Sequence, residues 1–394
     1  MTFVAKQWVF LPVVGVVILF LQPFALGNPQ VPCYFIFGDS QDDNGNNNYL
    51  NTTAKANYPP YGIDLPEGPT GRFTNGRNQA DFIAELLGFE GYMPPFANIK
   101  GQDITKGVNY ASAASGILDQ TGRQLGDIVS LNQQLQNHRR VTSQLVRLIG
   151  NEAATKEYLA KCLYTFAIGS NDYIDSYLLP EYYPTSRLRT PRQFARMLII
   201  EYSQQLRKLY RLGARKIAIF GLGFLGCVPG LLSIDGTCVD SLNSEVQLFN
   251  EELKPLVDEL NTELSGAHFI YVNVTAITLS TMPAVSAGQC NPGQIPCSSR
   301  NQYYFWDDFH PSEICTSALP LRWSSPGCRN PRVSDLHLVV LPANTRLWVL
   351  RRDSIILLKL GLDDLDGIGN FHLKNNGPAA LGFDEDLHAC PEWT

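Results

Sequence analysis

The sequence predicts an α/β protein of three layers, in which helices cover both faces of a central, mainly parallel β-sheet. Four short apolar runs have the composition of buried strands, at 34–37, 161–168, 215–220 and 269–274. Segments with helical spacing lie between them, and strands that alternate with helices favour a parallel sheet. With 394 residues and 44% apolar content, the chain can form one large α/β domain or two smaller ones.

The N-terminus has the three parts of a signal peptide. Lys6 precedes a long apolar stretch, which ends in the small-residue site Ala25–Gly27. We therefore expect residues 1–27 to be removed and the mature chain to be secreted to an extracellular location. An uncleaved signal anchor is the alternative, because the stretch approaches spanning length, but Pro12 and Pro23 favour removal. No later segment resembles a transmembrane helix, so no stable membrane anchor is expected after cleavage.

The charge and histidine patterns exclude two classes of partner. The formal net charge is −6 and becomes −7 if Lys6 leaves with the signal peptide. Lys and Arg are dispersed along the chain, which gives no basic footprint for nucleic acid. No pair of histidines has metal-ligand spacing, so we expect no metal site and no cofactor.

The nine cysteines belong to a chain that we expect to be exported, where disulfides can form. Close spacing makes Cys227/Cys238 and Cys290/Cys297 the candidate pairs. The odd count leaves at least one cysteine free or paired between chains.

Two N-glycosylation sequons occur, at Asn51-Thr52-Thr53 and Asn273-Val274-Thr275. In an exported chain, Asn51 and Asn273 are the predicted acceptors. The motif is short enough that chance alone could supply both.

The stretch Cys33–Asn48 changes abruptly from apolar to polar. Tyr34–Phe37 suits a strand buried on both faces, and Gly38 ends it. Ser40 then stands at the carboxyl edge of the sheet, where open α/β sheets bind their ligands. A serine there is a candidate nucleophile, but Asp39 or Ser40 capping a following helix is the commoner meaning of such a tripeptide. Catalysis is favoured only if a base, an acid and oxyanion donors are found elsewhere.

Residues 46–78 are rich in Asn, Pro, Gly and Tyr and predict a long surface loop. Helical spacing then predicts a helix over Arg77–Leu87. The small residues from Gly107 to Gly116 allow backbone amides to approach a ligand closely. Tight packing or a turn is the simpler meaning of that run.

The second strand, 161–168, ends like the first, in the small and polar residues Gly169–Tyr173. Two parallel strands that end in this way would place Ser40 and Asn171 along one edge of the sheet. The Asn171 side-chain amide can there donate to a developing oxyanion. Asn-Asp is also ordinary turn chemistry, so the motif taken alone does not establish that role.

Helical spacing predicts helices over Pro191–Leu212 and Leu242–Leu260, the second bent at Pro255. The strand 215–220 between them is followed by Gly221–Gly226, which matches the dinucleotide pattern G-x-G-x-x-G. We reject a nucleotide site, and with it an oxidoreductase, because the Cys-Val-Pro-Gly that follows prevents a helix from starting there.

Asp307 and His310 lie three residues apart in the stretch Tyr303–Glu313. Pro311 suits the first position of a helix, so both side chains can share the short loop before it. An acid beside an imidazole fixes its tautomer and stabilises its cation, as in a Ser-His-Asp system. Taken singly, a histidine before Pro-Ser is more often structural.

Four motifs in order give residues 31–313 a resemblance to the plant secreted GDSL esterases/lipases, which belong to the SGNH hydrolases. The motifs are FGDS at 37–40, GVNYASAASGI at 107–117, GSND at 169–172 and DxxH at 307–310, and GLGxLGC at 221–227 also matches that branch. The resemblance implies an SGNH hydrolase-like, flavodoxin-like α/β/α domain, here residues 28–313, that hydrolyses carboxylic esters without a cofactor. It also implies the apoplast or cell wall as the extracellular location.

The same resemblance implies roles for the matched residues. It makes Ser40 the nucleophile, His310 the base and Asp307 the residue that orients His310. Asn171 matches the amide donor of the oxyanion hole. The backbone donor lies between Ala113 and Gly116, where this chain has Ala-Ala in place of the frequent Gly-Gly.

The sequence departs from the family after Val274. The segment before Cys290 is shorter than usual, and residues 314–394 contain prolines that prevent a family-like closing helix. We expect this atypical C-terminal tail to be poorly ordered and protease-sensitive.

The sequence therefore predicts a secreted serine esterase or lipase that acts on a small or polymeric ester through an acyl-serine intermediate. The alternative is a catalytically impaired secreted binding protein that keeps the pocket but has an altered C-terminus. Turnover of a short acyl ester would distinguish the two. Lipids, cutin-like polyesters and acetylated polysaccharides present the same carbonyl, and the sequence does not select among them.

Overall fold

The computed structural model describes most of the chain between Asn28 and Thr316, and three strands beyond it. The described residues are 28–99, 103–275, 290–293, 295–296, 300, 303–316, 338–339, 347–351 and 354–358. The predicted signal peptide, residues 1–27, lies outside them. Most of the predicted tail, 314–394, also lies outside them, so its expected disorder stays a prediction.

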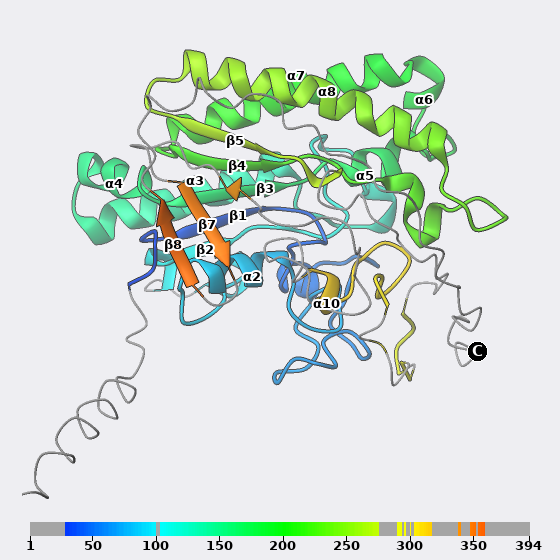
Figure 1. Ribbon diagram of the computed structural model, residues 1–394, viewed down its shortest axis with the longest axis horizontal. Helices are drawn as coiled ribbons and strands as arrows, with labels where there is room; N and C mark the ends of the chain where they lie inside the picture. Colours follow the sequence, from blue (N-terminus) through cyan, green and yellow to red (C-terminus); the bar gives the residue numbers. More distant parts are fainter. Residues whose placement is uncertain are drawn as a thin grey trace, which may run out of the picture.

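A five-stranded parallel sheet forms the centre of the molecule, in the order β2-β1-β3-β4-β5 (Figure 1). Its strands are β1 (Tyr34–Gly38), β2 (Gly107–Asn109), β3 (Leu163–Ala167), β4 (Lys216–Phe220) and β5 (His268–Val272). Every neighbouring pair is parallel. The predicted fold class is confirmed, and β2 is a strand that the sequence did not reveal.

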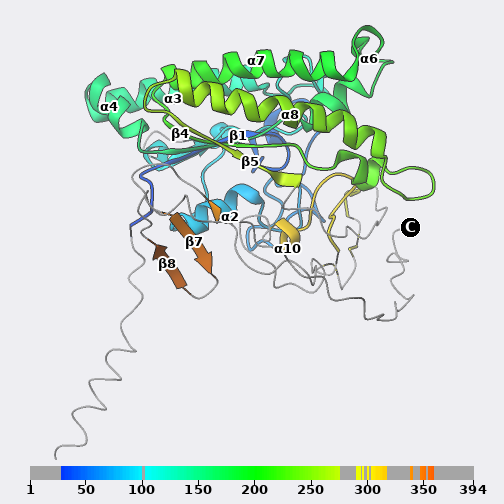
Figure 2. The same ribbon diagram turned by 45° about the horizontal axis from the view of Figure 1, so that its top comes forward.

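The helices divide between the two faces of the sheet (Figure 2). The longer ones are α2 (Gln79–Leu86), α3 (Leu131–Ile149), α4 (Glu152–Leu159), α7 (Pro191–Arg211) and α8 (Asp240–Glu263). The single turns are α5 (Ser170–Asp172), α6 (Thr185–Leu188) and α10 (Glu313–Thr316). Helices α7 and α8 lie over one face, and α2 and α10 lie on the other. Helix α8 contains the predicted Pro255 in its interior.

Alternation along β1 explains these layers. Phe35 and Phe37 point into the main core with residues of α3, α7 and α8, whereas Tyr34 and Ile36 pack against α2. The ring of Phe37 stacks on that of Phe166 in β3, with centroids 4.6 Å apart. Such an aromatic pair adds about 0.5–1.5 kcal/mol beyond the area that it buries. Strand β1 is therefore buried on both faces, as its composition predicts.

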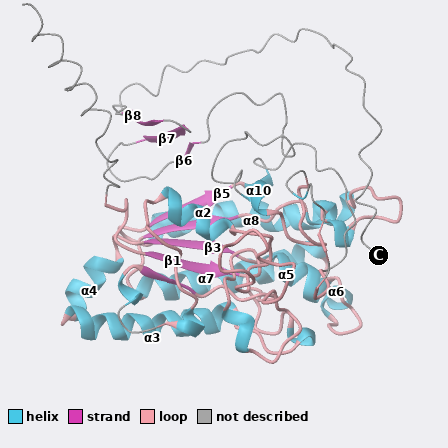
Figure 3. Cartoon of the chain, turned by 90° about the horizontal axis from the view of Figure 1, so that it is seen from below, coloured by secondary structure: helices cyan, strands magenta, loops and turns pink. Residues whose placement is uncertain are grey.

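Short turns complete the described chain. They are η1 (Asn46–Tyr49), η2 (Phe96–Asn98), η3 (Asp103–Thr105), η4 (Arg123–Leu125), the π-turn η5 (Tyr173–Tyr177), η6 (Leu225–Cys227) and η7 (Pro229–Leu231). A separate antiparallel sheet joins β6 (Leu338–Val339), β7 (Leu347–Arg351) and β8 (Ser354–Leu358) (Figure 3). None of the helices in the described part of the chain is both long and apolar enough to cross a membrane.

The segment 46–78 is only in part the surface loop that its composition predicts, because it contains buried as well as exposed residues. Tyr61, Phe73 and Asn75 within it are buried. Asparagine side chains satisfy the enclosed backbone: Asn46 Nδ2 donates to two carbonyl groups, at 2.7 and 3.0 Å, and Asn47 Nδ2 does the same at 2.9 and 3.1 Å. Side-chain amides therefore allow an irregular segment to be buried without leaving backbone groups unpaired.

Two disulfides are present among the described residues. The predicted Cys227–Cys238 bridge is formed. A second bridge, Cys33–Cys162, joins the residues that precede β1 and β3, and their separation of 129 residues hid it from spacing arguments. Cys290 is a free, buried thiol, and Cys297 lies outside the described residues. The predicted Cys290–Cys297 bridge is therefore not found.

Candidate active site

The ends of β1 and β3 bring two of the predicted site residues to the same edge of the sheet. Gly38 and Ala167 are direct neighbours in the register of these strands. A Cβ at Gly38 would lie 2.8 Å from the Ala167 carbonyl oxygen, which explains why glycine ends β1. Ser40 and Asn171 follow these strand ends, and both line one cavity.

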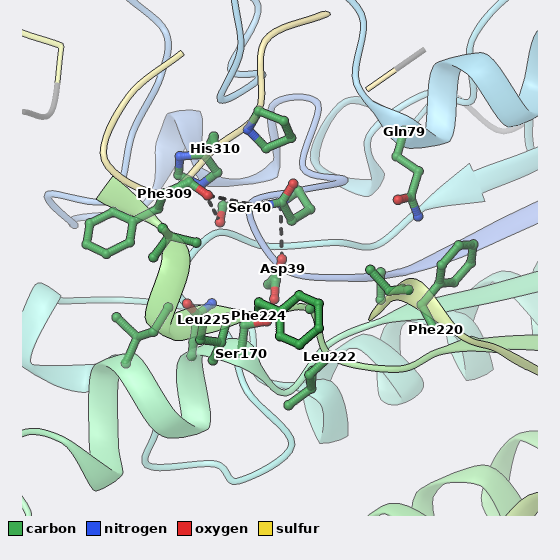
Figure 4. Close-up of a pocket in the computed structure, with 18 of the residues that line it drawn as sticks. Asp39, Ser40, Gln79, Ser170, Phe220, Leu222, Phe224, Leu225, Phe309 and His310 are labelled. Carbon is green, nitrogen blue, oxygen red and sulfur yellow. Dashed lines mark hydrogen bonds between the residues drawn. The ribbon is translucent and has the colours of Figure 1, made fainter. Parts of the chain in front are cut away.

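Three predicted residues meet in a hydrogen-bonded chain (Figure 4). Ser40 Oγ lies 2.7 Å from His310 Nε2, although 270 residues separate them in the sequence. His310 Nδ1 lies 2.8 Å from each carboxylate oxygen of Asp307. Asp307 is buried and His310 is 8% exposed, so the chain reaches solvent only near its serine end. This is the geometry by which a carboxylate orients an imidazole toward a hydroxyl.

The Asp307 carboxylate accepts hydrogen bonds from three residues. Oδ1 accepts from the backbone amides of Phe309 and His310, at 2.9 and 2.8 Å. Oδ2 accepts from the Tyr61 hydroxyl at 2.7 Å. Burial acts to raise the pKa of Asp307, but the charge of His310 and these hydrogen bonds together hold that pKa below its usual range. Asp307 is therefore ionised at neutral pH and can stabilise an imidazolium.

Asn171 is fixed by a single hydrogen bond. Its Nδ2 donates to the Ser115 carbonyl oxygen at 3.0 Å, and the side chain is buried. An amide nitrogen carries two hydrogens, so this bond sets the plane of the amide and uses one of the two donors. This contact with Ser115 could not be predicted from the sequence.

The two backbone positions expected near an oxyanion differ in their surroundings. The Ala113 amide donates to Asp43 Oδ2 at 3.0 Å and so is occupied, which removes Ala113 as a donor. A Cβ at Gly116 would lie 2.6 Å from the Asp172 carboxylate. Between them, Ala114 has φ of 61°, and it is the one non-glycine residue with positive φ in the described part of the chain.

Buried carboxylates connect the loops that carry the motifs, which the sequence did not indicate. Asp172 accepts from the amides of Ile117 and Leu118 and from the Thr121 hydroxyl, at 2.7, 3.1 and 2.6 Å. Burial raises its pKa to about 6, and the Thr121 hydroxyl and backbone donors oppose the rise. The GSND motif is thereby tied to the loop that follows β2.

Asp39, beside the serine, is also buried. Burial raises its pKa to about 7, while the hydrogen bond from the Gln41 amide and the charge of His310 act in the opposite direction. The capping role considered for Asp39 and Ser40 takes the form of a tight turn, because the amides of Asp42 and Asp43 both donate to the Asp39 carbonyl, at 3.2 and 3.0 Å.

The cavity beside Ser40 has a volume of about 150 Å³ and a mainly apolar wall (Figure 4). Its apolar lining includes Ile168, Ile174, Phe220, Leu222, Phe224, Leu225, Val228 and Phe309. The glycine-rich run 221–226 thus forms part of this wall after β4, and the short turns η6 and η7, rather than an α-helix, come next. The described residues contain no cluster of His, Cys, Asp and Glu side chains that could hold a metal ion.

The loop that carries His310 is supported by the segment 46–78. Asn75 Oδ1 accepts from the Glu313 amide at 2.8 Å, and Arg77 Nε pairs with Glu313 Oε1 at 2.5 Å. Before this loop, Arg300 forms two hydrogen bonds with Asp64, at 2.6 and 2.9 Å. Contacts from the N-terminal part of the chain therefore support the loop that carries His310.

Comparison with known proteins gives a consistent family. The sequence pattern of the GDSL-like lipase/acylhydrolase family matches residues 34–318. A GDSL esterase/lipase of Arabidopsis thaliana is 50% identical over 320 residues, which are 76% of this chain and 88% of that protein. A second one is 45% identical over 336 residues, which are 79% of this chain and 92% of that protein.

Among solved structures, the crystal structure of phospholipase A1 from Streptomyces albidoflavus NA297 is similar over 73% of this chain and 94% of the phospholipase chain. Its 12% identity and TM-score of 0.31 are too low to support a conclusion. The family pattern and the Arabidopsis relatives both extend over most of this chain. The chain therefore belongs to the GDSL-like lipase/acylhydrolase family and is a hydrolase that acts on ester bonds.

Proposed function

We propose that the chain hydrolyses carboxylic esters through an acyl-serine intermediate on Ser40. The observation that supports this most strongly is the 2.7 Å distance between Ser40 Oγ and His310 Nε2. The neutral imidazole of His310 carries its proton on Nδ1, which donates a hydrogen bond to Asp307, and therefore has a free lone pair on Nε2. That lone pair can take the serine proton as the hydroxyl attacks.

Acylation proceeds in one proton cycle. Ser40 Oγ attacks the ester carbonyl while His310 Nε2 takes the hydroxyl proton. The imidazolium, stabilised by ionised Asp307, then gives that proton to the leaving alcohol, and the acyl group remains on Ser40. Water, deprotonated in turn by His310, attacks the acyl-serine, and the imidazolium gives that proton to Ser40 Oγ as the acid leaves. The enzyme returns to its starting state.

Asn171 supplies the side-chain donor to the tetrahedral oxyanion. Its contact with the Ser115 carbonyl fixes the amide before the substrate arrives, and the second Nδ2 hydrogen is then available to the oxyanion. With Ala113 bound to Asp43, Gly116 is the backbone donor that we retain from the two candidates.

A fluorophosphonate that traps reactive serines tests this proposal. The purified protein should take up one label, and peptide mass spectrometry should find it on Ser40. A label on another residue, or ester turnover by protein that the reagent leaves unlabelled, would exclude Ser40 as the nucleophile.

The alternative of an impaired binding protein has less support. It assumed that the altered tail deprives His310 of its support, yet Asn75 and Arg77 contact Glu313 within the described residues. An impaired protein would bind but not turn over short acyl esters. We expect turnover, with hydrophobic acyl or alcohol groups favoured by the apolar wall beside Ser40.

Secretion and glycosylation belong to the same proposal. The Cys33–Cys162 and Cys227–Cys238 bridges support an oxidising compartment, and Asn51 is exposed, as an acceptor must be. When the chain is expressed in a plant secretory system, the protein recovered from the culture medium should begin near residue 28. Peptide-N-glycosidase should reduce its mass, and an unchanged mass would exclude glycans at Asn51 and Asn273.

A further inference from the structure

Tyr61 contacts the carboxylate of Asp307, although the two residues lie far apart in the sequence. Its hydroxyl donates to Asp307 Oδ2 at 2.7 Å across 246 residues. Both residues are buried, at 0% and 1% exposure. Burial raises the pKa of the Tyr61 hydroxyl, and the nearby Asp307 charge raises it further. Tyr61 is therefore protonated at any physiological pH and can only be the donor in this bond.

The donors to Asp307 are unequally divided between its two oxygens. Oδ1 accepts from the backbone amides of Phe309 and His310 as well as from the imidazole. Oδ2 accepts from the imidazole and from Tyr61. Without the Tyr61 hydroxyl, a buried anionic oxygen would have only the shared imidazole hydrogen. The carboxylate could then rotate or move about its Oδ1 anchors.

We propose that Tyr61 is a positioning residue for the ester hydrolysis, whose hydroxyl fixes Asp307 in the orientation that aims His310 at Ser40. This role rests on the proposed Ser40–His310–Asp307 mechanism. Tyr61 does not touch the reacting atoms, and it acts through the carboxylate.

The surroundings of Tyr61 are built to keep its hydroxyl in place. Its ring packs edge to face against Phe73 and Tyr58, with centroids 5.8 and 5.4 Å away. The Phe73 ring in turn lies against the His310 ring at 5.0 Å. The backbone is pinned on both sides, because the Tyr61 amide donates to the Tyr58 carbonyl and the Gly62 amide to the Thr74 carbonyl, at 3.1 and 2.9 Å.

The hydroxyl also moderates the charge that His310 experiences. A donor to Oδ2 draws negative charge away from Nδ1, so its removal makes Asp307 a stronger hydrogen-bond partner of the His310 imidazolium. Asp39 and Asp175 act electrostatically on His310 as well. Their contributions are common to the wild-type protein and to a variant that lacks only this hydroxyl.

The test compares Tyr61→Phe with wild type, using a short acyl ester over a range of pH and active sites counted with the fluorophosphonate. Phenylalanine keeps the ring and removes only the hydroxyl. We expect kcat per active site to fall by roughly 10-fold to 10²-fold, as small misplacements of catalytic groups cause. KM should stay within about twofold, since only the transition state uses the lost orientation. The acid limb of kcat/KM should move to higher pH, because the carboxylate that faces the imidazolium loses a competing donor.

Tyr58→Phe is the matched control. Tyr58 lies in the same turn and touches the Tyr61 ring, but its hydroxyl donates to the Cys290 carbonyl at 3.1 Å. The control should keep the wild-type kcat and acid limb. Wild-type values in Tyr61→Phe would overturn the proposal. Equal changes in both variants would also overturn it, because the packing of the turn would then be responsible.

A second measurement applies if Tyr61→Phe does not accumulate as folded protein. Replacing Tyr61 by 3-fluorotyrosine keeps the hydroxyl and makes it a stronger donor, so the acid limb should move to lower pH. An unmoved limb would contradict the proposal. Full activity in Ser40→Ala would instead refute the underlying mechanism, whatever the Tyr61 variants show.

Discussion

The carboxylate of Asp43 accepts a hydrogen bond from the backbone amide of Ala113, at 3.0 Å. The same carboxylate accepts from the amides of Gly45 and Asn46, at 2.8 and 2.7 Å. It therefore joins the loop that follows β1, which carries Ser40, to the loop that follows β2. One buried side chain sets the spacing between the nucleophile loop and the 113–116 segment.

Replacing Ser40 by alanine should reduce kcat to near background, by as much as roughly 10⁶-fold, because the triad members act as a unit. His310 would then have no hydroxyl to deprotonate. Steady-state kinetics on a short acyl ester measures the loss, and circular dichroism verifies the fold. Retention of full activity would remove Ser40 from the mechanism.

Asn171→Ala should lower kcat by about 10² to 10³-fold with little change in KM, as the loss of one oxyanion donor does. The reason is that the Asn171 amide donates to a negatively charged oxygen that exists only in the tetrahedral intermediate. The same ester assay separates kcat from KM. An effect confined to KM would make Asn171 a substrate-binding or turn residue instead.

Ala114→Gly should be less destabilising than Ala113→Gly by about 1–2 kcal/mol, the cost of a left-handed conformation at a non-glycine residue. Both variants remove one buried methyl group and loosen the unfolded chain equally, so their difference isolates the positive φ of Ala114. Urea unfolding of the two variants gives the comparison. Equal destabilisation would show that Ala114 carries no such strain.

Asn75→Ala should lower kcat on the order of tenfold, because it cuts the contact with the Glu313 amide that supports the His310 loop. Asn57→Ala, at an exposed position of the same segment, is the control and should keep wild-type activity. Kinetics normalised to fluorophosphonate-labelled sites provides the measurement. An unchanged kcat in Asn75→Ala would mean that other contacts alone hold the loop.

Thermal stability should decrease from pH 5 to pH 8. Burial raises the pKa of Asp39 to about 7 and the pKa values of Asp43 and Asp172 to about 6. In the unfolded chain these carboxyl groups have a pKa of about 3.9. The native state thus binds their protons more tightly, and this stabilisation is complete below about pH 4 and is lost as pH rises through 6 and 7.

Asp307 contributes with the opposite sign. Its pKa is lowered in the native state, so its contribution is present above the unfolded value and is lost as pH falls further. Unfolding midpoints in low-salt buffers at pH 5 and pH 8 test the balance. A higher midpoint at pH 8 would show that the buried carboxyls do not retain their protons.

The chemistry-bearing residues could be predicted where the information is local. Asp307 and His310 lie in one turn. The two strand ends before Ser40 and Asn171 are marked by an abrupt change from apolar to polar residues. Helix α3 escaped prediction because its inward face includes buried Gln134 and His138, which interrupt the apolar spacing. The role of Tyr61 could not be predicted, because its loop contains several tyrosines and no local pattern shows which of them contacts a carboxylate 246 residues away.

The Cys33–Cys162 bridge encloses the residues of β1, the segment 46–78 and β2 within one covalent ring. A protease that cuts once anywhere inside this ring opens it without releasing a fragment. The nicked chain would migrate as a single species on a non-reducing gel and separate into two only after reduction. Ser40 would thus stay attached to the half of the molecule that carries Asn171 and His310 even after the backbone between them has been cut.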